Sequence, residues 1–455
     1  MIFNGGAESE LAEWAAATEW GDIPPSTQRF VREFFMDSLG SALAGVAIGE
    51  VDAVRGAAGQ LAGAGPCSVI GGRTASLYGA TMVGAYLVTA ATVCDVHRET
   101  QCHVGPSVVP AALATAEFMD RTDEETLAAV AVGLEVATRV AMSLKPKVSR
   151  ERGWHAPGVA GPFGAAAAVA RLLGVGVGEM ITALSLASSQ ASGTYSQWAT
   201  PGVKFHQTHG ALAGLLAAEL AAQGLRASHT FLQNADGGFL RVYSDGGDVT
   251  QLVADLGQRF ELERISLRRW PGGTYVQSLV TGLFELLAQS DVGAPTVRRL
   301  AITMSPAAFS MHGQQGWGEP FTARLSARYI GAVVLLDRAC WLAQFTGERI
   351  AEADVNRLAE QVVQVSADPS LEDAAIRLEV ELEGGRRLGV DVAEPYGAPA
   401  RRLTAAHLEE KFMVSGTPVL GADRTVAALS LLQGTSGWRA TQVGTALRSE
   451  AGGEA

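Results

Sequence analysis

Charged residues and cysteines are scarce in this chain of 455 residues, and both shortages narrow its class. Asp, Glu, Lys and Arg make up 18% of the residues and hydrophobic types 47%, a balance that excludes a disordered chain. The formal net charge of -12 argues against a nucleic-acid partner, because phosphate binding requires a basic surface. The four cysteines follow no disulfide pattern, so we expect a reduced, cytoplasmic protein.

Targeting segments and long apolar runs are lacking as well. The first residues include Glu8, Glu10 and Glu13 and have neither the basic nor the apolar region of a secretory signal. Arg171 and Glu219 interrupt the longest apolar stretches, which fall short of the roughly 18 residues that a spanning helix needs. We therefore expect no membrane association.

Histidine is also rare, but several of the eight histidines gather in two segments. One segment runs from Asp95 to His103, and the other is Gly153-Trp-His155, which precedes an Ala-rich stretch. An unperturbed imidazole titrates near about 6.5, so histidine is the usual general acid or base at neutral pH. The two segments therefore predict proton-transfer chemistry.

Apolar residues recur at helical spacing up to about residue 255. In 27–44, Phe30, Phe34 and Leu39 show this spacing, and Thr122-Asp-Glu-Glu125 is a capping box that predicts a helix start at Asp123. The expected helices are 27–44, 75–92, 110–119, 123–143, 162–173, 178–192 and 208–224. Because most of them are rich in Ala and Gly, we expect an all-helical core with close helix packing.

The period changes to that of strands near residue 260. Expected strands are 259–268, 296–304 and 375–382, and Gly384-Gly385 turns the last of them into a hairpin with 386–392. Expected helices are 274–289, 328–345, 404–412 and 425–432. The predicted fold class is mainly α with a smaller α+β domain. The predicted domains are a helical domain over 1–267, an α+β domain over 268–400, and carboxy-terminal helices over 401–455 that return to the helical domain.

Four stretches of the first half follow a recognisable order. They are Phe35-Met-Asp-Ser-Leu-Gly-Ser-Ala-Leu-Ala-Gly45, Asp95-Val-His-Arg98 with His103-Val-Gly-Pro106, Gly153-Trp-His-Ala-Pro-Gly158, and Gly202-Val-Lys204 with Gly210-Ala-Leu-Ala-Gly214. In this order they resemble the MmgE/PrpD family, which includes 2-methylcitrate dehydratases, cis-aconitate decarboxylases and iminodisuccinate epimerases. The likeness thins in the second half, to the turn 268–277, the stretch 321–329 and Lys411-Phe412.

The resemblance implies a large helical domain with a smaller α+β lid, assembled as a homodimer. It implies small di- or tricarboxylic acids as substrates, and no metal or organic cofactor. Asp95 falls on a family aspartate, His103 on a turn histidine, His155 on the histidine of a Gly-Phe-His turn, and Lys204 on a family lysine. These four are the expected catalytic residues.

The turn 268–277 departs from the family pattern. The family typically has a lysine there, then a Cys or His, then a Thr-His pair, whereas this chain has Gly273 and Gln277, which cannot transfer protons. Arg268 and Arg269 can keep the positive charge and clamp a carboxylate through paired hydrogen bonds. The acid or base of this turn is therefore missing or comes from elsewhere in the chain.

The chemistry of such substrates can also be argued from the residues alone. Proton removal beside a carboxylate needs a base and expulsion of a hydroxyl needs an acid, and a histidine near its usual pKa can be either. Lys204 can anchor a carboxylate as a point charge, and Asp95 can orient a histidine or raise its basicity. The further substrate-binding candidates are His97, Arg98, Tyr195 and Gln197.

Each candidate also has a structural role open to it. Asp95 or His103 can cap a helix, and Lys204 can be an exposed turn residue. The other structural roles are a surface pairing of His97 and Arg98 with Glu99, and helix-start positions for His206 and His209, which we favour for those two residues.

A metal site is not expected. The residues that suggest zinc are Cys94, Asp95, His97, Cys102 and His103, but their spacing lacks the paired ligands of familiar zinc sites. Three functions remain open: a cofactor-independent lyase that dehydrates or decarboxylates a small polycarboxylate, an isomerase that moves a proton next to a carboxylate, and a non-catalytic ligand-binding protein. We favour the lyase.

Overall fold

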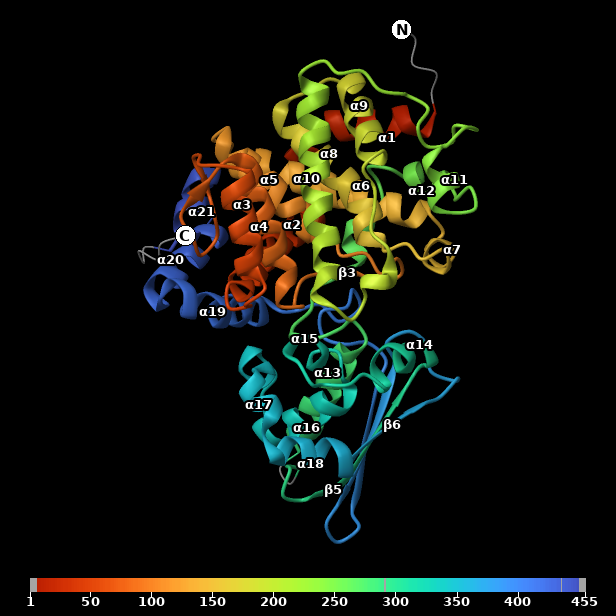
Figure 1. Cartoon of the computed structure of the whole chain (residues 1–455), viewed down its shortest axis with the longest axis vertical. Coiled ribbons are helices and arrows are strands. Elements are labelled where there is room, and N and C mark those ends of the chain that lie inside the picture. Colours follow the sequence, from red (N-terminus) through yellow and green to blue (C-terminus); the bar gives the residue numbers. More distant parts are fainter. Residues whose placement is uncertain (1–5, 290–291, 435, 450–455) are drawn as a thin grey trace. The chain divides into compact units, whose positions relative to one another are not determined.

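The structure is a computed structural model that describes residues 6–289, 292–434 and 436–449 (Figure 1). The chain forms two compact units, and each has its own core. Unit 1 comprises Met1–Ile265 and Ala405–Ala455, and unit 2 comprises Ser266–Thr404.

Unit 1 is helical. Its α-helices are α1 (Ala7–Ala17), α2 (Pro25–Gly45), α3 (Val51–Leu61), α4 (Leu77–Ala90), α5 (Gly105–Phe118), α6 (Asp123–Ser143), α7 (Pro146–Glu151), α8 (Ala156–Leu173), α9 (Val177–Ser188), α10 (Phe205–Ala222), α11 (Phe239–Tyr243), α12 (Thr250–Val253), α19 (Ala405–Leu420), α20 (Ala422–Gln433) and α21 (Ala440–Leu447). Its shorter elements are the 3-10 helices η1 (Trp20–Asp22), η2 (Tyr195–Gln197), η3 (Pro201–Lys204) and η4 (Glu261–Arg264), and the two-residue strands β1 (Cys67–Ser68), β2 (Thr74–Ala75) and β3 (Val96–His97). The strand β4 (Ile265–Ser266) lies at the boundary of the units.

Small residues let α8 approach its neighbours closely. A Cβ atom on Gly133 of α6 would lie 2.7 Å from the carbonyl oxygen of Gly164 of α8, and a Cβ on Gly164 would lie 2.5 Å from that of Gly133. On α10, a Cβ on Gly214 would lie 2.4 Å from the side chain of Ala165. Figure 1 shows α6, α8 and α10 within the bundle of unit 1. The close helix packing expected from the Ala and Gly content is therefore present.

Two helices begin earlier than the sequence analysis predicts. Helices α5 and α8 continue through Pro110 and Pro162, where we placed their starts. A proline inside a helix removes one hydrogen bond and crowds the preceding turn. Each proline here packs against a glycine of another helix, Pro110 against Gly84 and Pro162 against Gly210. The prediction was wrong because the facing glycine that accommodates each ring is far away in the sequence.

Helices α6 and α8 are long and apolar enough to cross a membrane by composition alone. The apolar stretch of α6 is completely buried inside the structure and that of α8 is 83% buried. Both are therefore core helices of the kind that a soluble protein contains.

A buried ion pair on α6 holds the segment that follows α12. The carboxylate of Glu135 lies 2.6 Å from Arg139 and accepts the N–H groups of Glu261 and Leu262. Arg139 in turn donates to the carbonyl oxygen of Arg259 at 2.9 Å. The side chains of Glu135 and Arg139 therefore hydrogen-bond to backbone groups that would otherwise pair with a neighbouring strand. The predicted strand 259–268 is wrong, and η4 and β4 stand in its place.

Unit 2 is built on a mixed four-stranded sheet. Its elements are α13 (Val276–Leu287), β5 (Val297–Met304), α14 (Pro306–Ala308), the π-helical turn η5 (Phe309–Gly313), α15 (Pro320–Ala323), α16 (Ala327–Asp337), η6 (Leu342–Phe345), α17 (Gly347–Ala351), α18 (Ala353–Gln361), β6 (Val363–Ala367), β7 (Ile376–Leu382) and β8 (Arg387–Val392). The strand order is β6-β5-β7-β8, parallel between β5 and β6 and antiparallel elsewhere. The predicted hairpin of β7 and β8 is present.

One face of this sheet is covered by helices. Ile376, Leu378, Val380 and Leu382 of β7 are buried in alternation, and burying each such side chain contributes about 1.5–3 kcal/mol. Gly282 of α13 lies against Leu378, so α13 rests directly on the sheet (Figure 1). With this sheet and the helical unit 1, the predicted fold class is confirmed.

Helix α16 ends at Asp337, eight residues before the predicted end at residue 345. Arg338 takes a left-handed conformation with φ of 51°, and its guanidinium donates to the carbonyl oxygens of Leu287 and Val292. These bonds stop the helix, and η6 follows as a separate turn.

Candidate active site

The segment from Asp95 to Gly105 is a tight hairpin whose ends meet. The N–H of His97 donates to the carbonyl of Cys102 at 2.8 Å, and the N–H of Cys102 donates back at 3.3 Å. His103 Nδ1 then lies 2.6 Å from the Asp95 carbonyl oxygen. Because a carbonyl only accepts, Nδ1 carries a proton, and in neutral His103 Nε2 is the basic nitrogen.

The Asp95 carboxylate is buried at the start of α5. Its Oδ2 accepts the N–H of Val104 at 2.9 Å, and both oxygens lie 3.2 Å from the N of Gly105. Burial, followed by Cys94, raises the pKa of Asp95 to about 7, against the lowering effects of His103 and the two N–H groups. The side chain of Asp95 therefore binds the free N–H groups at the start of a helix, while its backbone carbonyl orients His103.

His155 lies in a turn that is hydrogen-bonded to a second turn. The N–H of His155 donates to the Gly193 carbonyl at 3.0 Å, and the N–H of Tyr195 donates to the Gly153 carbonyl at 2.7 Å. Gly153 and Gly193 have φ angles of 89° and 105°, which favour glycine. The paired turns place His155 directly before α8, with its ring 5.8 Å from that of Tyr195.

A second imidazole, that of His206 on α10, contacts His155. The two Nδ1 atoms lie 2.9 Å apart, and both side chains are buried. The pKa of His155 lies well below its usual range, first because of burial and then because of its basic neighbours His206, His103, Lys204 and Arg150. The predicted residues His103 and Lys204 therefore both lie close enough to His155 to lower its pKa.

Lys204 is buried at the start of α10, and its Nζ donates to Thr92 Oγ1 at 3.2 Å. Thr92 has a φ of 58°, which is rare for a β-branched residue. The next carbonyl, that of Val93, accepts from Lys411 Nζ at 2.9 Å, and Lys411 also pairs with Asp37 at 2.7 Å. The buried ion pair thus holds the backbone beside Thr92 in place.

Tyr195 and Gln197 lie on the short helix η2. Tyr195 is half-buried, and the guanidinium of Arg150 lies 3.2 Å from its ring centre. Burial raises the pKa of the Tyr195 phenol, and Arg150 partly offsets this rise. Gln197 is exposed.

The sequence analysis considered a pairing of His97 with Glu99, but in the structure each of these side chains contacts another residue. His97 Nδ1 lies 2.9 Å from Thr100 Oγ1, and burial, with Arg264, lowers the pKa of His97 to about 4 despite the opposing charge of Glu261. Glu99 pairs with Arg264 at 2.5 Å. Arg98, between them, is half-buried.

Arg268 and Arg269 belong to unit 2. The Arg268 guanidinium donates to the Gly272 carbonyl at 2.8 Å, and that of Arg269 lies over the rings of Trp270 and Tyr396 at 5.2 and 5.5 Å. Their role as carboxylate clamps stays a prediction.

The turn that carries Gly273 encloses a histidine that the sequence analysis missed. A Cβ atom on Gly273 would lie 2.3 Å from Cε1 of His312, so only glycine leaves room for this imidazole. His312 Nδ1 donates to the Leu325 carbonyl at 2.8 Å, and burial lowers the pKa of His312 to about 4. Gln277 braces the same turn through Trp270.

Three residues around His155 and Lys204 also escaped the sequence analysis. Arg150 and Thr92 were not named, and His206 was assigned to a helix start. His206 does lie in the first turn of α10, but its side chain reaches His155. A signal for Arg150 was the basic run 145–150 just before Gly153.

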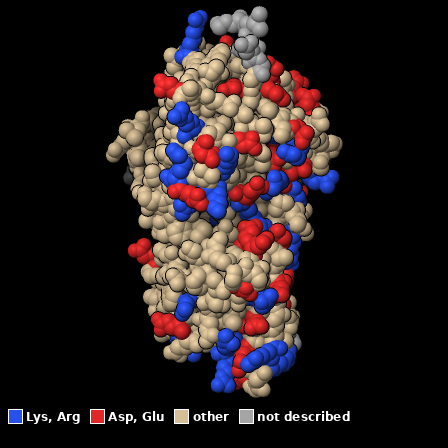
Figure 2. Space-filling model, turned by 90° about the vertical axis from the view of Figure 1, so that its right-hand side faces the viewer, with Lys and Arg blue, Asp and Glu red and all other residues tan. Residues whose placement is uncertain are grey.

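His103, His155 and His206, which we call the histidine cluster, lie among basic side chains. On the face shown in Figure 2, acidic and basic side chains are intermixed. Around His155, by contrast, the four side chains that lower its pKa most after burial are all basic. An anion is the ligand that such surroundings favour.

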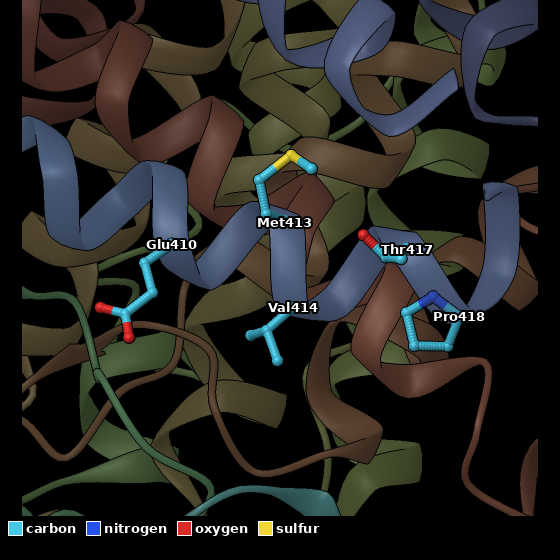
Figure 3. Close-up of a pocket in the computed structure, with 5 residues that line it drawn as sticks. All are labelled: Glu410, Met413, Val414, Thr417 and Pro418. Carbon is cyan, nitrogen blue, oxygen red and sulfur yellow. The ribbon is translucent and has the colours of Figure 1, made fainter. Parts of the chain in front are cut away.

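A shallow hollow of about 540 Å³ lies along α19 (Figure 3). Its lining residues are Glu410, Met413, Val414, Thr417 and Pro418. None of these belongs to the histidine cluster, so this hollow is not the candidate active site. Within the described ranges, no three His, Cys, Asp or Glu side chains are grouped to hold a metal ion.

Comparison with known proteins gives matches along most of the chain. The family model described as the MmgE/PrpD N-terminal domain matches residues 9–252, and that of the MmgE/PrpD C-terminal domain matches residues 270–433. A cis-aconitate decarboxylase of Aspergillus terreus is 26% identical over 422 residues, covering 86% of each chain. The human cis-aconitate decarboxylase is 24% identical over 349 residues, covering 73% of this chain and 71% of its own.

Proposed function

Because the chain belongs to the MmgE/PrpD family, we propose that it is a lyase that dehydrates or decarboxylates a small di- or tricarboxylic acid without a cofactor. The relatives named cis-aconitate decarboxylase support decarboxylation of a tricarboxylic acid as the first reaction to test. Their identity of 24–26% to this chain is too low to carry the substrate over directly.

The observation that carries the proposal is the set of basic groups around His155. His103 and His155 supply imidazoles, and Lys204 supplies a buried ammonium within the same electrostatic neighbourhood. A substrate carboxylate would supply a negative charge beside these basic groups. Fixed cations of this kind are most valuable when charge develops on the substrate during reaction.

The two imidazoles suit either decarboxylation or dehydration. Loss of carbon dioxide leaves an electron pair on carbon, which an imidazole N–H can then protonate. Loss of water requires one group to remove a proton from carbon and another to protonate the departing hydroxyl. We assign these roles to His103 and His155, and the anchoring of a carboxylate to Lys204. Asp95 supports His103 by fixing the hairpin.

A screen of di- and tricarboxylic acids in deuterated buffer, with no added cofactor, tests the proposal by mass spectrometry. Release of carbon dioxide or water supports the lyase. Retention of substrate mass apart from deuterium uptake would replace it by the isomerase. Binding without any conversion would replace it by a ligand-binding protein.

Substitution of either histidine tests the site. We expect His103→Ala and His155→Ala to lower kcat by about 100-fold or more, because each removes a proton-transfer group. The control is His229→Ala, which changes an exposed histidine. Activity close to that of the unchanged protein in both site variants, with folding verified by circular dichroism, would refute the assignment.

The proposal also includes a cellular compartment and an oligomeric state. The four free, buried cysteines support a reducing compartment such as the cytoplasm. We also propose a homodimer, as the family resemblance implies, and sedimentation analysis would test it.

A further inference from the structure

His155 and His206 share a hydrogen bond that requires a proton between them. Their Nδ1 atoms lie 2.9 Å apart, and an imidazole nitrogen either donates or accepts. One Nδ1 must therefore carry a proton while the other accepts it. If both were protonated, two donors would face each other at this distance.

The surroundings hold the pair in this arrangement. Gly193 accepts the backbone N–H of His155, and a Cβ on Gly193 would lie 2.8 Å from the His206 ring. Gly158 packs against the His206 Cβ from α8. The turn at Gly193 and helix α8 thus fix the two rings, with centroids 5.0 Å apart.

The charges around the two rings are unequal. His155 faces His103 from the hairpin, Lys204 from the start of α10 and Arg150 from α7. Burial and then His209, on the same helix, lower the pKa of His206, but no lysine or arginine is among the causes of this shift. An additional proton on the pair is therefore better placed on His206 than on His155, which lies among more cationic groups.

We propose that His206 is a positioning residue that holds the charge of this imidazole pair, so that His155 exchanges a proton with substrate while it stays uncharged. The inference rests on the proposed function. When His155 acts as an acid, its Nε2–H bond breaks as the proton bonds to substrate carbon. The Nδ1 proton of a cationic His206 moves to His155 Nδ1, which leaves both rings neutral.

The pair returns to its starting state once product has left. A solvent proton adds to His155 Nε2, and the Nδ1 proton passes back to His206. One proton enters from solvent and one leaves in product for each turnover. This balance matches decarboxylation of a carboxylate, which consumes one proton.

His206→Asn tests this role. An asparagine side chain can reach the position of Nδ1 and hydrogen-bond to His155, but it cannot take up a proton at neutral pH. We expect kcat to fall by about 100-fold with little change in KM, and the pH profile of kcat to lose the ionisation of the pair. The control is His229→Asn, which changes an exposed histidine outside the pair and should keep both kcat and the profile.

Nitrogen-15 NMR of histidine-labelled protein tests the pair without any substrate. We expect His155 and His206 to titrate in a coupled manner, with the first added proton on His206, and His206→Asn to leave His155 with a single-site titration. This result stands or falls independently of whether the right substrate is found. Independent titration of the two rings, or unchanged kcat and pH profile in a folded His206→Asn variant, would overturn the proposal.

Discussion

At the scale of single residues, two buried imidazoles are held uncharged in the folded chain. His97 in unit 1 and His312 in unit 2 each use Nδ1 for a hydrogen bond, and burial lowers the pKa of both to about 4. In the unfolded chain each has an ordinary pKa near 6.5. Between these two values the unfolded chain binds more protons than the folded one.

This difference predicts a loss of stability in acid. Stability from each histidine is fully present above pH 6.5 and is lost as pH falls through about 4, by up to about 3 kcal/mol per residue. His97→Asn and His312→Asn should flatten this dependence, as measured by urea unfolding between pH 7 and 4. His229→Asn, at an exposed position, is the control and should leave the slope unchanged.

The role of a single residue could be predicted from the sequence only where the residues that determine this role are close to it in the chain. The pattern around Asp95 and His103 indicated a site, but it left open whether the Asp95 carboxylate orients a histidine or caps a helix. The structure uses its backbone carbonyl for the first task and its side chain for the second. The contact of His155 with His206 joins residues 51 positions apart, which local spacing cannot reveal.

At the scale of elements, helix contacts in unit 1 depend on the absence of side chains at a few positions. Gly133 and Gly164 face each other across α6 and α8, each close to the carbonyl oxygen of the other. Backbone atoms cannot rotate away as a side chain can. A methyl group at either position must therefore push the helices apart.

We expect Gly133→Ala or Gly164→Ala to lower the free energy of unfolding by about 1–3 kcal/mol or more. The matched control is Gly56→Ala on the exposed face of α3, where nothing lies within 4 Å of the added methyl. That change should stabilise the protein by about 0.5–1 kcal/mol, because alanine favours helix. Chemical denaturation measures all three, and similar effects at the three positions would contradict the packing argument.

Periodicity predicted most of the helices and the β7–β8 hairpin, and its errors have a common cause. Pro110 and Pro162 were taken as helix starts, but Gly84 and Gly210 on other helices accommodate their rings. The predicted strand 259–268 does not form because Glu135 and Arg139 hydrogen-bond to the backbone of this segment. In each case a distant residue decided the local conformation.

At the scale of the whole molecule, the chain returns to unit 1 after completing unit 2. Helix α19 packs against α2 there, with Phe412 against Gly40 and Lys411 paired with Asp37. The two members of this buried pair are 374 positions apart in sequence. The same ammonium binds the Val93 carbonyl beside Thr92.

Lys411→Met should therefore destabilise the protein by about 3–5 kcal/mol, because it leaves the Asp37 carboxylate buried without this cation. Adding Asp37→Asn should cost less than the sum of the two single changes, since the double variant contains neither charge of the pair. Urea unfolding of the four proteins measures the coupling. Additive effects would show that the pair is energetically unimportant.

The position of Lys411 also sets an order of events during synthesis. A ribosome makes the hairpin of Asp95 and His103 early, yet the ammonium that braces the adjacent backbone emerges only after all of unit 2 has been translated. The nascent amino-terminal part therefore lacks this ion pair until Lys411 has been translated. Premature termination before that codon would release a polypeptide that contains both histidines of the proposed chemistry but not the brace beside them.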